Sequence, residues 1–112
     1  MSVRPEDLPQ RLRRAWSSET ASTWTAENPA RGQCSVTAIA VQRLLGGEIL
    51  NTETAEGTHF YNRIGGIRYD FTAAQFAEPI AYQDLASHVD EALTDTSPNQ
   101  VSALMQARGE RA

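Results

Sequence analysis

The stretch 31–47, RGQCSVTAIAVQRLLGG, decides how the chain folds and contains its single cysteine. Between Cys34 and Leu45, apolar side chains cover most of a helical circumference, and the pair Gly46–Gly47 is a stop signal. The pattern predicts a buried central helix that begins at Cys34. At this position, unpaired backbone N–H groups and the helix dipole stabilise a negative charge.

Three strand candidates follow this helix. They are GEILNTE from Gly47, THFYNRI from Thr58 and GIRYDFT ending at Thr72. The two-residue loop Gly65–Gly66 joins the last two strands into an antiparallel hairpin. We therefore expect a small antiparallel sheet of about three strands, packed on the central helix.

The hairpin register sets the distance between His59 and Asp70. With the glycine pair as the loop, Tyr61 faces Asp70, and His59 is a diagonal neighbour of Asp70 on the same face. Such Cα atoms lie roughly 7–8 Å apart, within reach of an imidazole–carboxylate hydrogen bond. The same register places Phe60 and other apolar residues on the opposite face. Either both faces of the sheet are covered, or a bulge or longer loop shifts the register.

Helices are expected on both sides of this core. Asp7 caps a short amphipathic helix that includes Trp16, and a long loop at 17–31 carries Trp24. Beyond the hairpin, the chain is expected to form a turn at 73–76, a helical segment at 82–93 and a last helix at 98–108, with Ser97 and Gln100 at capping-box spacing and Gly109 at its end. The predicted fold class is thus α+β.

Size and composition fit a single domain over residues 1–112. Hydrophobic residues make up 40% and charged residues 21%, which is typical of a globular chain. Fourteen acidic residues against ten scattered basic ones give a net charge of −4, so no positive stripe for nucleic acid is present. All the basic residues are arginine, which excludes a lysine Schiff base.

The cysteine count and the hydropathy predict the compartment. One cysteine cannot form an internal disulfide, no apolar run is long enough to cross a membrane, and residues 1–16 lack the apolar core of a secretion signal. We therefore expect a cytoplasmic protein with a free thiol and no membrane partner. His88 has no second histidine or cysteine nearby, so we expect neither a metal site nor a cofactor.

Cys34, His59 and Asp70 follow one another in the order of a nucleophile, a general base and an orienting acid. The stretch HFYNRIGGIRYDFT at 59–72 resembles the histidine–aspartate hairpin of transglutaminase-like proteins. GQCSVTA at 32–38 is similar to their Gly-x-Cys helix start. A thiol, an imidazole and a carboxylate in this layout are typical of a cysteine nucleophile site.

The chain order and the helix-then-sheet layout also resemble the wider papain-like superfamily, including the NlpC-type hydrolases. More closely, the stretch from Trp16 to Phe76 resembles the uncharacterised bacterial YunG-like proteins, through NPARGQCSVTA, GGEIL, HFYN and YDFTAAQF. The resemblance implies a papain-like core in which the cysteine-bearing helix packs on the antiparallel sheet, flanked by N- and C-terminal helices. It departs from larger transglutaminases in lacking a calcium-type acidic loop.

The resemblance implies Cys34 as the nucleophile, His59 as general base and then acid, and Asp70 as the residue that orients the imidazole. The implied activity is a thiol hydrolase or acyltransferase that acts on an amide, isopeptide or thioester. The substrate would be a peptide or protein-derived amide.

Four further residues are candidates for oxyanion or substrate binding. Gln33, beside Cys34, could donate its side-chain amide to an oxyanion, or could cap the helix or bond the preceding loop. Trp24, Tyr61 and Asn62 could shape a substrate cleft, although aromatic side chains in small domains mostly pack in the core.

Other interpretations remain open at this point. Each residue of the proposed triad has an ordinary structural role available: a buried thiol, a strand histidine and a strand-end carboxylate. A non-enzymatic module that binds a peptide or a partner protein on a degenerate papain-like fold is the main alternative. A deamidase or toxin-associated activity would use the same three residues.

Overall fold

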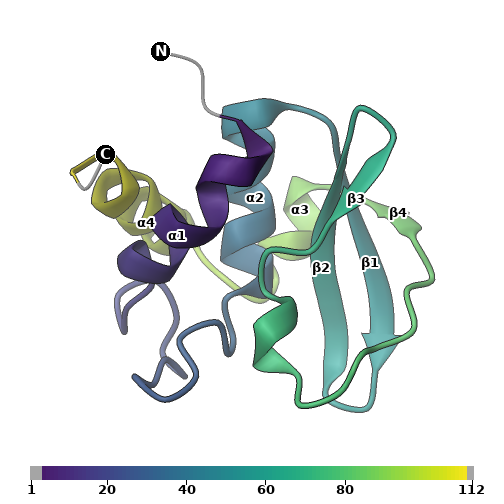
Figure 1. The fold of residues 1–112 in the computed structure, drawn as a ribbon, viewed down its shortest axis with the longest axis horizontal. Helices are drawn as coiled ribbons and strands as arrows, with labels where there is room; N and C mark the ends of the chain where they lie inside the picture. The colour runs from purple at the N-terminus through teal and green to yellow at the C-terminus, as the bar shows by residue number, and fades with distance from the viewer. Residues whose placement is uncertain (1–3, 111–112) are drawn as a thin grey trace.

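Helix α2 (Cys34–Leu45) runs through the centre of the molecule and has the predicted bounds. The computed structural model describes residues 4–110. In it, α1 (Leu8–Ala15) and α4 (Pro98–Glu110) lie on one side of α2, and the sheet lies on the other (Figure 1). The helix is buried from Ser35 through Val41. Because this part of α2 is covered on all sides, its apolar circumference is explained by its central position.

Four antiparallel strands form the sheet, in the order β3–β2–β1–β4. Their bounds are β1 (Glu48–Thr54), β2 (Gly57–Ile64), β3 (Ile67–Tyr69) and β4 (Leu85–Ser87). The first three are the predicted strands, but β3 stops at Tyr69 and does not continue to Thr72. The reason is a local turn in which the Asp70 carboxylate accepts a hydrogen bond from the Thr72 backbone N–H at 3.2 Å.

The predicted hairpin register is confirmed. Ile64 pairs with Ile67, and Asn62 pairs with Tyr69. The loop glycines Gly65 and Gly66 have φ angles of 57° and 81°, a conformation that two-residue hairpin loops require and that residues with a Cβ rarely adopt.

Both faces of β2 are covered, which settles the alternative left open by the sequence. Residues 59–62 are all buried. On one face, Asn62 Nδ2 donates to the Ala38 carbonyl of α2 at 3.0 Å. On the other, Phe76 packs edge-on against His59, with 4.8 Å between ring centroids. The segment that follows β3 therefore forms a second cover over the sheet.

The N-terminal helix is confirmed, but the predicted capping by Asp7 is wrong, because the Asp7 carboxylate instead accepts from the Arg4 backbone N–H at 3.4 Å, and the helix ends at Ala15. Short helix η1 (Pro5–Asp7) leads into α1, which buries Leu8, Leu12 and Ala15 against the core. Trp16 follows at the end of α1 and donates its indole N–H to Thr37 Oγ1 at 2.9 Å. No helix within residues 4–110 combines the length and apolar character that a membrane crossing needs.

The C-terminal third departs from its prediction. The turn at 73–76 is confirmed as η2 (Ala73–Gln75), and the Gln100 backbone N–H bonds Ser97 Oγ at 3.2 Å, as a capping spacing requires. The helix expected at 82–93 is wrong, because the chain there forms β4 and then the short helix α3 (Val89–Ala92). Pairing of β4 with β1 overrides the local helical preference. Helix α4 also continues past Gly109, to Glu110.

Candidate active site

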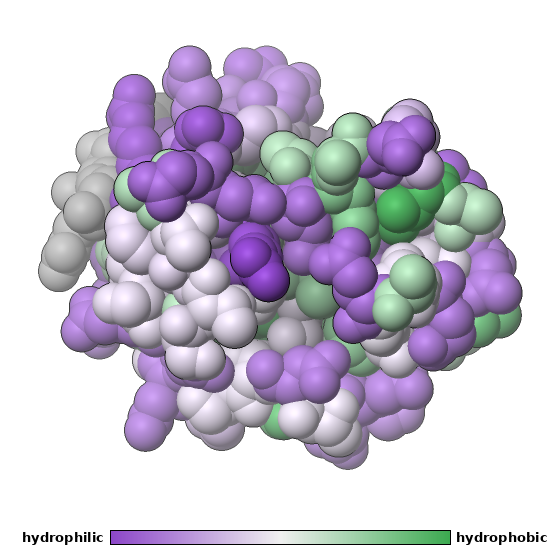
Figure 2. All heavy atoms as spheres, turned by 90° about the horizontal axis from the view of Figure 1, so that it is seen from below, coloured by the Kyte–Doolittle hydropathy of each residue, from purple (hydrophilic) through white to green (hydrophobic). Residues whose placement is uncertain are grey.

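Cys34 is the first residue of α2 and lines a cavity of about 250 Å³. Its side chain is partly buried, with one side against the core. First-turn backbone N–H groups have no partner within a helix, so they favour negative charge near this sulfur. The cavity is bounded by the loop before α2, the β1–β2 turn and η2. This end of the molecule faces the viewer in Figure 2, where hydrophilic and neutral surface dominates.

His59 and Asp70 form a buried pair at this cavity. His59 Nε2 lies 2.7 Å from Asp70 Oδ2, and the two side chains are 2% and 5% exposed. Because β3 ends before Asp70, the carboxylate reaches along the open edge of β2 to the ring, as the diagonal register predicts. Asp70 is itself fixed by the Tyr82 hydroxyl, which donates to Oδ2 at 2.7 Å, and by Thr72, whose Oγ1 lies 3.3 Å from Oδ1.

The environment of His59 raises the pKa of its ring to about 9. Burial acts in the opposite direction, because it disfavours the charged imidazolium. The hydrogen bond with Asp70, the interaction with the Cys34 side chain and the charges of both groups outweigh burial. Cys34 and His59 line the same cavity. A thiol and an imidazole in this relation can exchange a proton.

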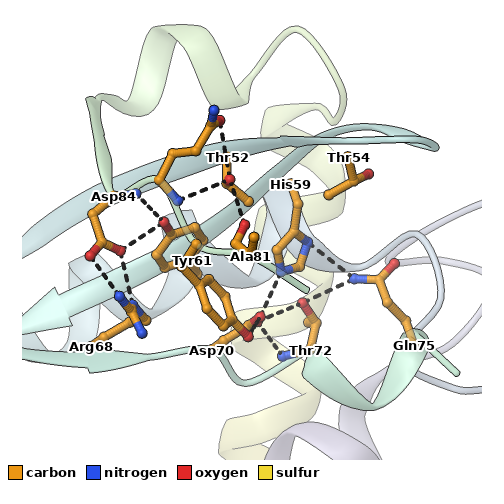
Figure 3. Close-up of polar contacts among 12 residues, drawn as sticks. Thr52, Thr54, His59, Tyr61, Arg68, Asp70, Thr72, Gln75, Ala81 and Asp84 are labelled. Atoms are coloured by element: carbon orange, nitrogen blue, oxygen red, sulfur yellow. Dashed lines mark hydrogen bonds and ion pairs between the residues drawn. The ribbon is translucent and has the colours of Figure 1, made fainter. Parts of the chain in front are cut away.

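The second ring nitrogen of His59 is directed toward Gln75. Gln75 Nε2 lies 3.4 Å from His59 Nδ1, and Figure 3 shows the ring between Asp70 on one side and Gln75 on the other. Because Asp70 occupies Nε2, Nδ1 is the nitrogen available to a thiol. Gln75 also lines the cavity, together with Phe76.

Gln33 and Trp24 are not among the described residues of the cavity wall. Gln33 is fully buried, and its Oε1 accepts a hydrogen bond from Thr20 Oγ1 at 2.8 Å. The Gln33 Nε2 and the Trp24 indole nitrogen are buried without a hydrogen-bond partner among the residues that the structure describes. Gln33 thus keeps an unused donor beside the cysteine, while Trp24 packs against the core.

Tyr61 and Asn62 are buried in the framework, and neither belongs to the described cavity wall. The Tyr61 hydroxyl donates to Asp84 Oδ1 at 2.8 Å and accepts from the Asp84 backbone N–H at 2.7 Å. Burial and the Asp84 carboxylate raise the pKa of Tyr61 to about 12. Hydrogen bonds from Arg68 and Tyr61 lower the pKa of Asp84 to about 2. On the opposite face, Asn62 ties β2 to α2.

Three residues at the site were not identified from the sequence: Gln75, Phe76 and Tyr82. The first two follow Asp70 in the turn AAQF, so proximity in the chain was an available signal. Tyr82 lies in an irregular segment, at the position where the sequence predicted the start of a helix. In the described part of the chain, no three histidine, cysteine or acidic side chains are grouped as a metal would require.

Sequence comparison gives the class of protein to which this fold and site belong. The family model "YunG protein" matches residues 4–111, and the chain belongs to this family. The relative "Uncharacterized protein YunG" of Bacillus subtilis (strain 168) is 46% identical over 96 residues, which cover 86% of this chain and 84% of the relative. No solved structure matches significantly.

Proposed function

We propose that this protein is a thiol hydrolase or acyltransferase that acts on an amide, isopeptide or thioester through Cys34, His59 and Asp70. The observation that carries the proposal is the 2.7 Å contact between His59 and Asp70 beside the cavity that Cys34 lines. This contact supports a single ring orientation and, in the neutral form of the ring, a single tautomer with the proton on Nε2 and the lone pair on Nδ1.

The fold supports a papain-like or transglutaminase-like interpretation. The cysteine begins a buried helix, the histidine lies on an adjacent antiparallel strand, and the aspartate follows the next strand. In this interpretation the helix start provides the thiolate with positive potential, and the hairpin provides the base.

The first half of the proposed reaction acylates the cysteine. The Cys34 proton moves to His59 Nδ1, and the sulfur attacks the substrate carbonyl carbon to form a C–S bond. The imidazolium is stabilised by Asp70, and then gives its proton to the leaving amine or thiol as the bond to that group breaks. The product of this half is a thioester on Cys34.

The second half releases the acyl group. Water or an acceptor amine attacks the thioester carbonyl and loses a proton to His59, and the C–S bond breaks. The departing sulfur takes the proton back, so both side chains return to their starting states. Water gives hydrolysis and an amine gives acyl transfer.

Two donors are available for the developing oxyanion. The backbone N–H groups at the start of α2 are free of partners within the helix. The Gln33 side chain has an unpartnered Nε2 next to Cys34 in sequence, which supports its predicted role as a second donor.

The cavity suits a peptide or protein-derived amide. Its wall carries one positive and one negative side chain, Arg31 and Glu56, together with the hydroxyl groups of Thr23, Thr54 and Thr58. Such a lining can bond the amide groups and charged ends of a peptide. We expect the protein to act in the cytoplasm, where the thiol stays reduced.

Acylation by p-nitrophenyl acetate tests the proposal. Intact-mass measurement and peptide mapping should find one acetyl group on Cys34 of the native protein and none at that position in Cys34→Ser. His59→Gln should slow acetylation because the thiol loses its base. Acetylation of Cys34 at the same rate in the native protein and in His59→Gln would contradict the proposal. Peptide binding that persists in Cys34→Ser without acylation of the native protein would favour the non-enzymatic module.

A further inference from the structure

Gln75 joins the segment that carries the thiol to the segment that carries the imidazole. Its Oε1 accepts a hydrogen bond from the Gly32 backbone N–H at 3.4 Å, two residues before Cys34. Its Nε2 lies 3.2 Å from Thr72 Oγ1 and 3.4 Å from His59 Nδ1. Figure 3 shows the last two contacts beside the His59–Asp70 pair. The amide therefore spans the wall of the cavity.

These partners fix the direction of the amide. A backbone N–H can only donate, so the Gly32 N–H must face the oxygen of the Gln75 side chain. The NH₂ group is then turned toward the ring, and it too can only donate. In the neutral form of the ring, His59 Nδ1 therefore acts as the acceptor, and the ring proton lies on Nε2, directed at Asp70.

We propose that Gln75 is a positioning residue that selects the Nε2–H tautomer in the neutral form of His59, and that its amide must leave Nδ1 before the ring can take the Cys34 proton. The role of this step in catalysis rests on the function proposed above. When the proton moves from sulfur to Nδ1, the ring carries hydrogen on both nitrogens. A donor of Gln75 would then face a donor of the ring. The amide and the thiol thus compete for one nitrogen, and substrate that displaces the amide would favour the thiolate.

Other groups that face His59 also influence its protonation. Cys34 from α2 and Asp70, the residue after β3, favour the charged ring. The Tyr82 hydroxyl supports Asp70 from the covering segment, and Tyr61 stacks beside the ring on β2 itself. On the cavity wall the charged side chains are those of Arg31 and Glu56. All of these remain when Gln75 is replaced, so a change in the titration of His59 would report the amide.

Substitutions at Gln75 can be ordered by what they offer to Nδ1. The native amide offers a donor, Gln75→Leu offers neither donor nor acceptor, and Gln75→Glu offers an acceptor that can bond the Gly32 N–H and a protonated Nδ1 together. The backbone carbonyl of Gln75 still accepts from Asn28 Nδ2 in every variant, which helps to keep the segment in place. The pKa of His59 should therefore rise from native to Gln75→Leu to Gln75→Glu.

The experiment is an NMR titration of the imidazole nitrogens in the three proteins. Each step should raise the pKa of His59 by about 0.5–1 unit, since one hydrogen bond has a net value of about 1 kcal/mol. In the native protein, the nitrogen shifts of the neutral form should identify the Nε2–H tautomer. The signals of His88, which lies outside the cavity at the start of α3, should not change among the variants. Gln75→Met replaces Gln75→Leu if the branched side chain prevents folding.

The results can overturn this inference separately from the proposed function. Equal His59 titrations in all three proteins, or the Nδ1–H tautomer in the native protein, would exclude the positioning role and leave acylation of Cys34 unaffected. Conversely, the predicted order of pKa values without acetylation of Cys34 would retain the role of Gln75 and reject the enzyme. If Gln75 had only a structural role, its replacement would lower stability, but the His59 pKa values of the three proteins would not follow the predicted order.

Discussion

The two faces of β2 are both buried, but by different kinds of contact. Phe60 and Asn62 lie against α2, where apolar packing dominates and one amide bonds a helix carbonyl. His59 and Tyr61 lie under the segment 70–84, which covers them with two carboxylates, a phenol and an aromatic ring. The first face depends on buried apolar area. The second depends on matched polar partners.

The α2 face thus contributes mainly to stability, and the covered face holds the groups with chemistry. Apolar burial stabilises in proportion to area and is insensitive to pH. A buried imidazole–carboxylate pair is sensitive to pH and is costly when one partner is removed. Substitutions on the α2 face should thus change the free energy of unfolding, whereas those on the covered face should change the reactivity of Cys34 as well.

The largest effect on stability is expected on the α2 face. Phe60→Ala should lower the free energy of unfolding by about 3–5 kcal/mol, because it removes a large side chain from the core. Urea denaturation measures this loss. Ile67→Ala, at a side chain that is 57% exposed, is the control and should change stability by no more than about 0.5 kcal/mol. Equal losses of stability in the two variants would contradict the assignment of Phe60 to the core.

The covered face should make stability depend on pH. The pKa of His59 is raised from 6.5 to about 9, so the folded state binds this proton more tightly than the unfolded state does. The resulting stabilisation is fully present below pH 6.5 and is lost as the pH rises to about 9. The loss should be at most roughly 3 kcal/mol. Urea denaturation midpoints should fall as the pH rises through this range in the native protein and in His88→Gln. They should not show this fall in His59→Gln.

Asp70→Asn should affect both the stability of the protein and the reactivity of Cys34, and each effect can be measured separately. It removes the charge that stabilises the imidazolium, and an Asn amide that donates to Nε2 would select the wrong tautomer. We expect a loss of about 1–3 kcal/mol in stability and a decrease of about tenfold in the alkylation rate of Cys34 near neutral pH. Thermal denaturation and iodoacetamide kinetics measure the two. A variant with native alkylation kinetics would argue that Asp70 has only a structural role.

The smallest effect is expected at the support of Asp70. Tyr82→Phe keeps the ring that packs on Tyr61 but removes the hydroxyl that bonds Asp70 at 2.7 Å. Stability should fall by about 1 kcal/mol. Tyr69→Phe is the matched control, because the Tyr69 ring stacks on Phe71 outside this network. Similar losses of stability in both variants would show that the Tyr82 hydroxyl does not support Asp70.

The sequence predicts the parts of the fold that local patterns determine. The apolar circumference and the glycine stop define α2, and a two-residue glycine loop defines the hairpin register. The diagonal relation of His59 and Asp70 follows from that register, and the structure has the contact. Strand β4 could not be found in this way, because three residues become a strand only by pairing with the distant β1.

The rest of the site depends on an irregular segment. Tyr82 and Phe76 reach His59 and its partner because the chain at 70–84 folds back over the sheet, and no period in the sequence predicts such a path. Among the residues predicted to bind substrate, Tyr61 and Asn62 instead bond Asp84 and Ala38, since alternation along a strand does not say what covers each face.

In the proposed site, Cys34 and His59 share a proton, and Asp70 holds the ring. The decisive measurement is the rate constant for alkylation of Cys34 by iodoacetamide from pH 5 to 10, in the native protein and in His59→Ala. The native protein should react faster than free cysteine near neutral pH, and His59→Ala should lose this advantage. Coincident pH profiles, both like that of an ordinary thiol, would show that His59 does not activate Cys34.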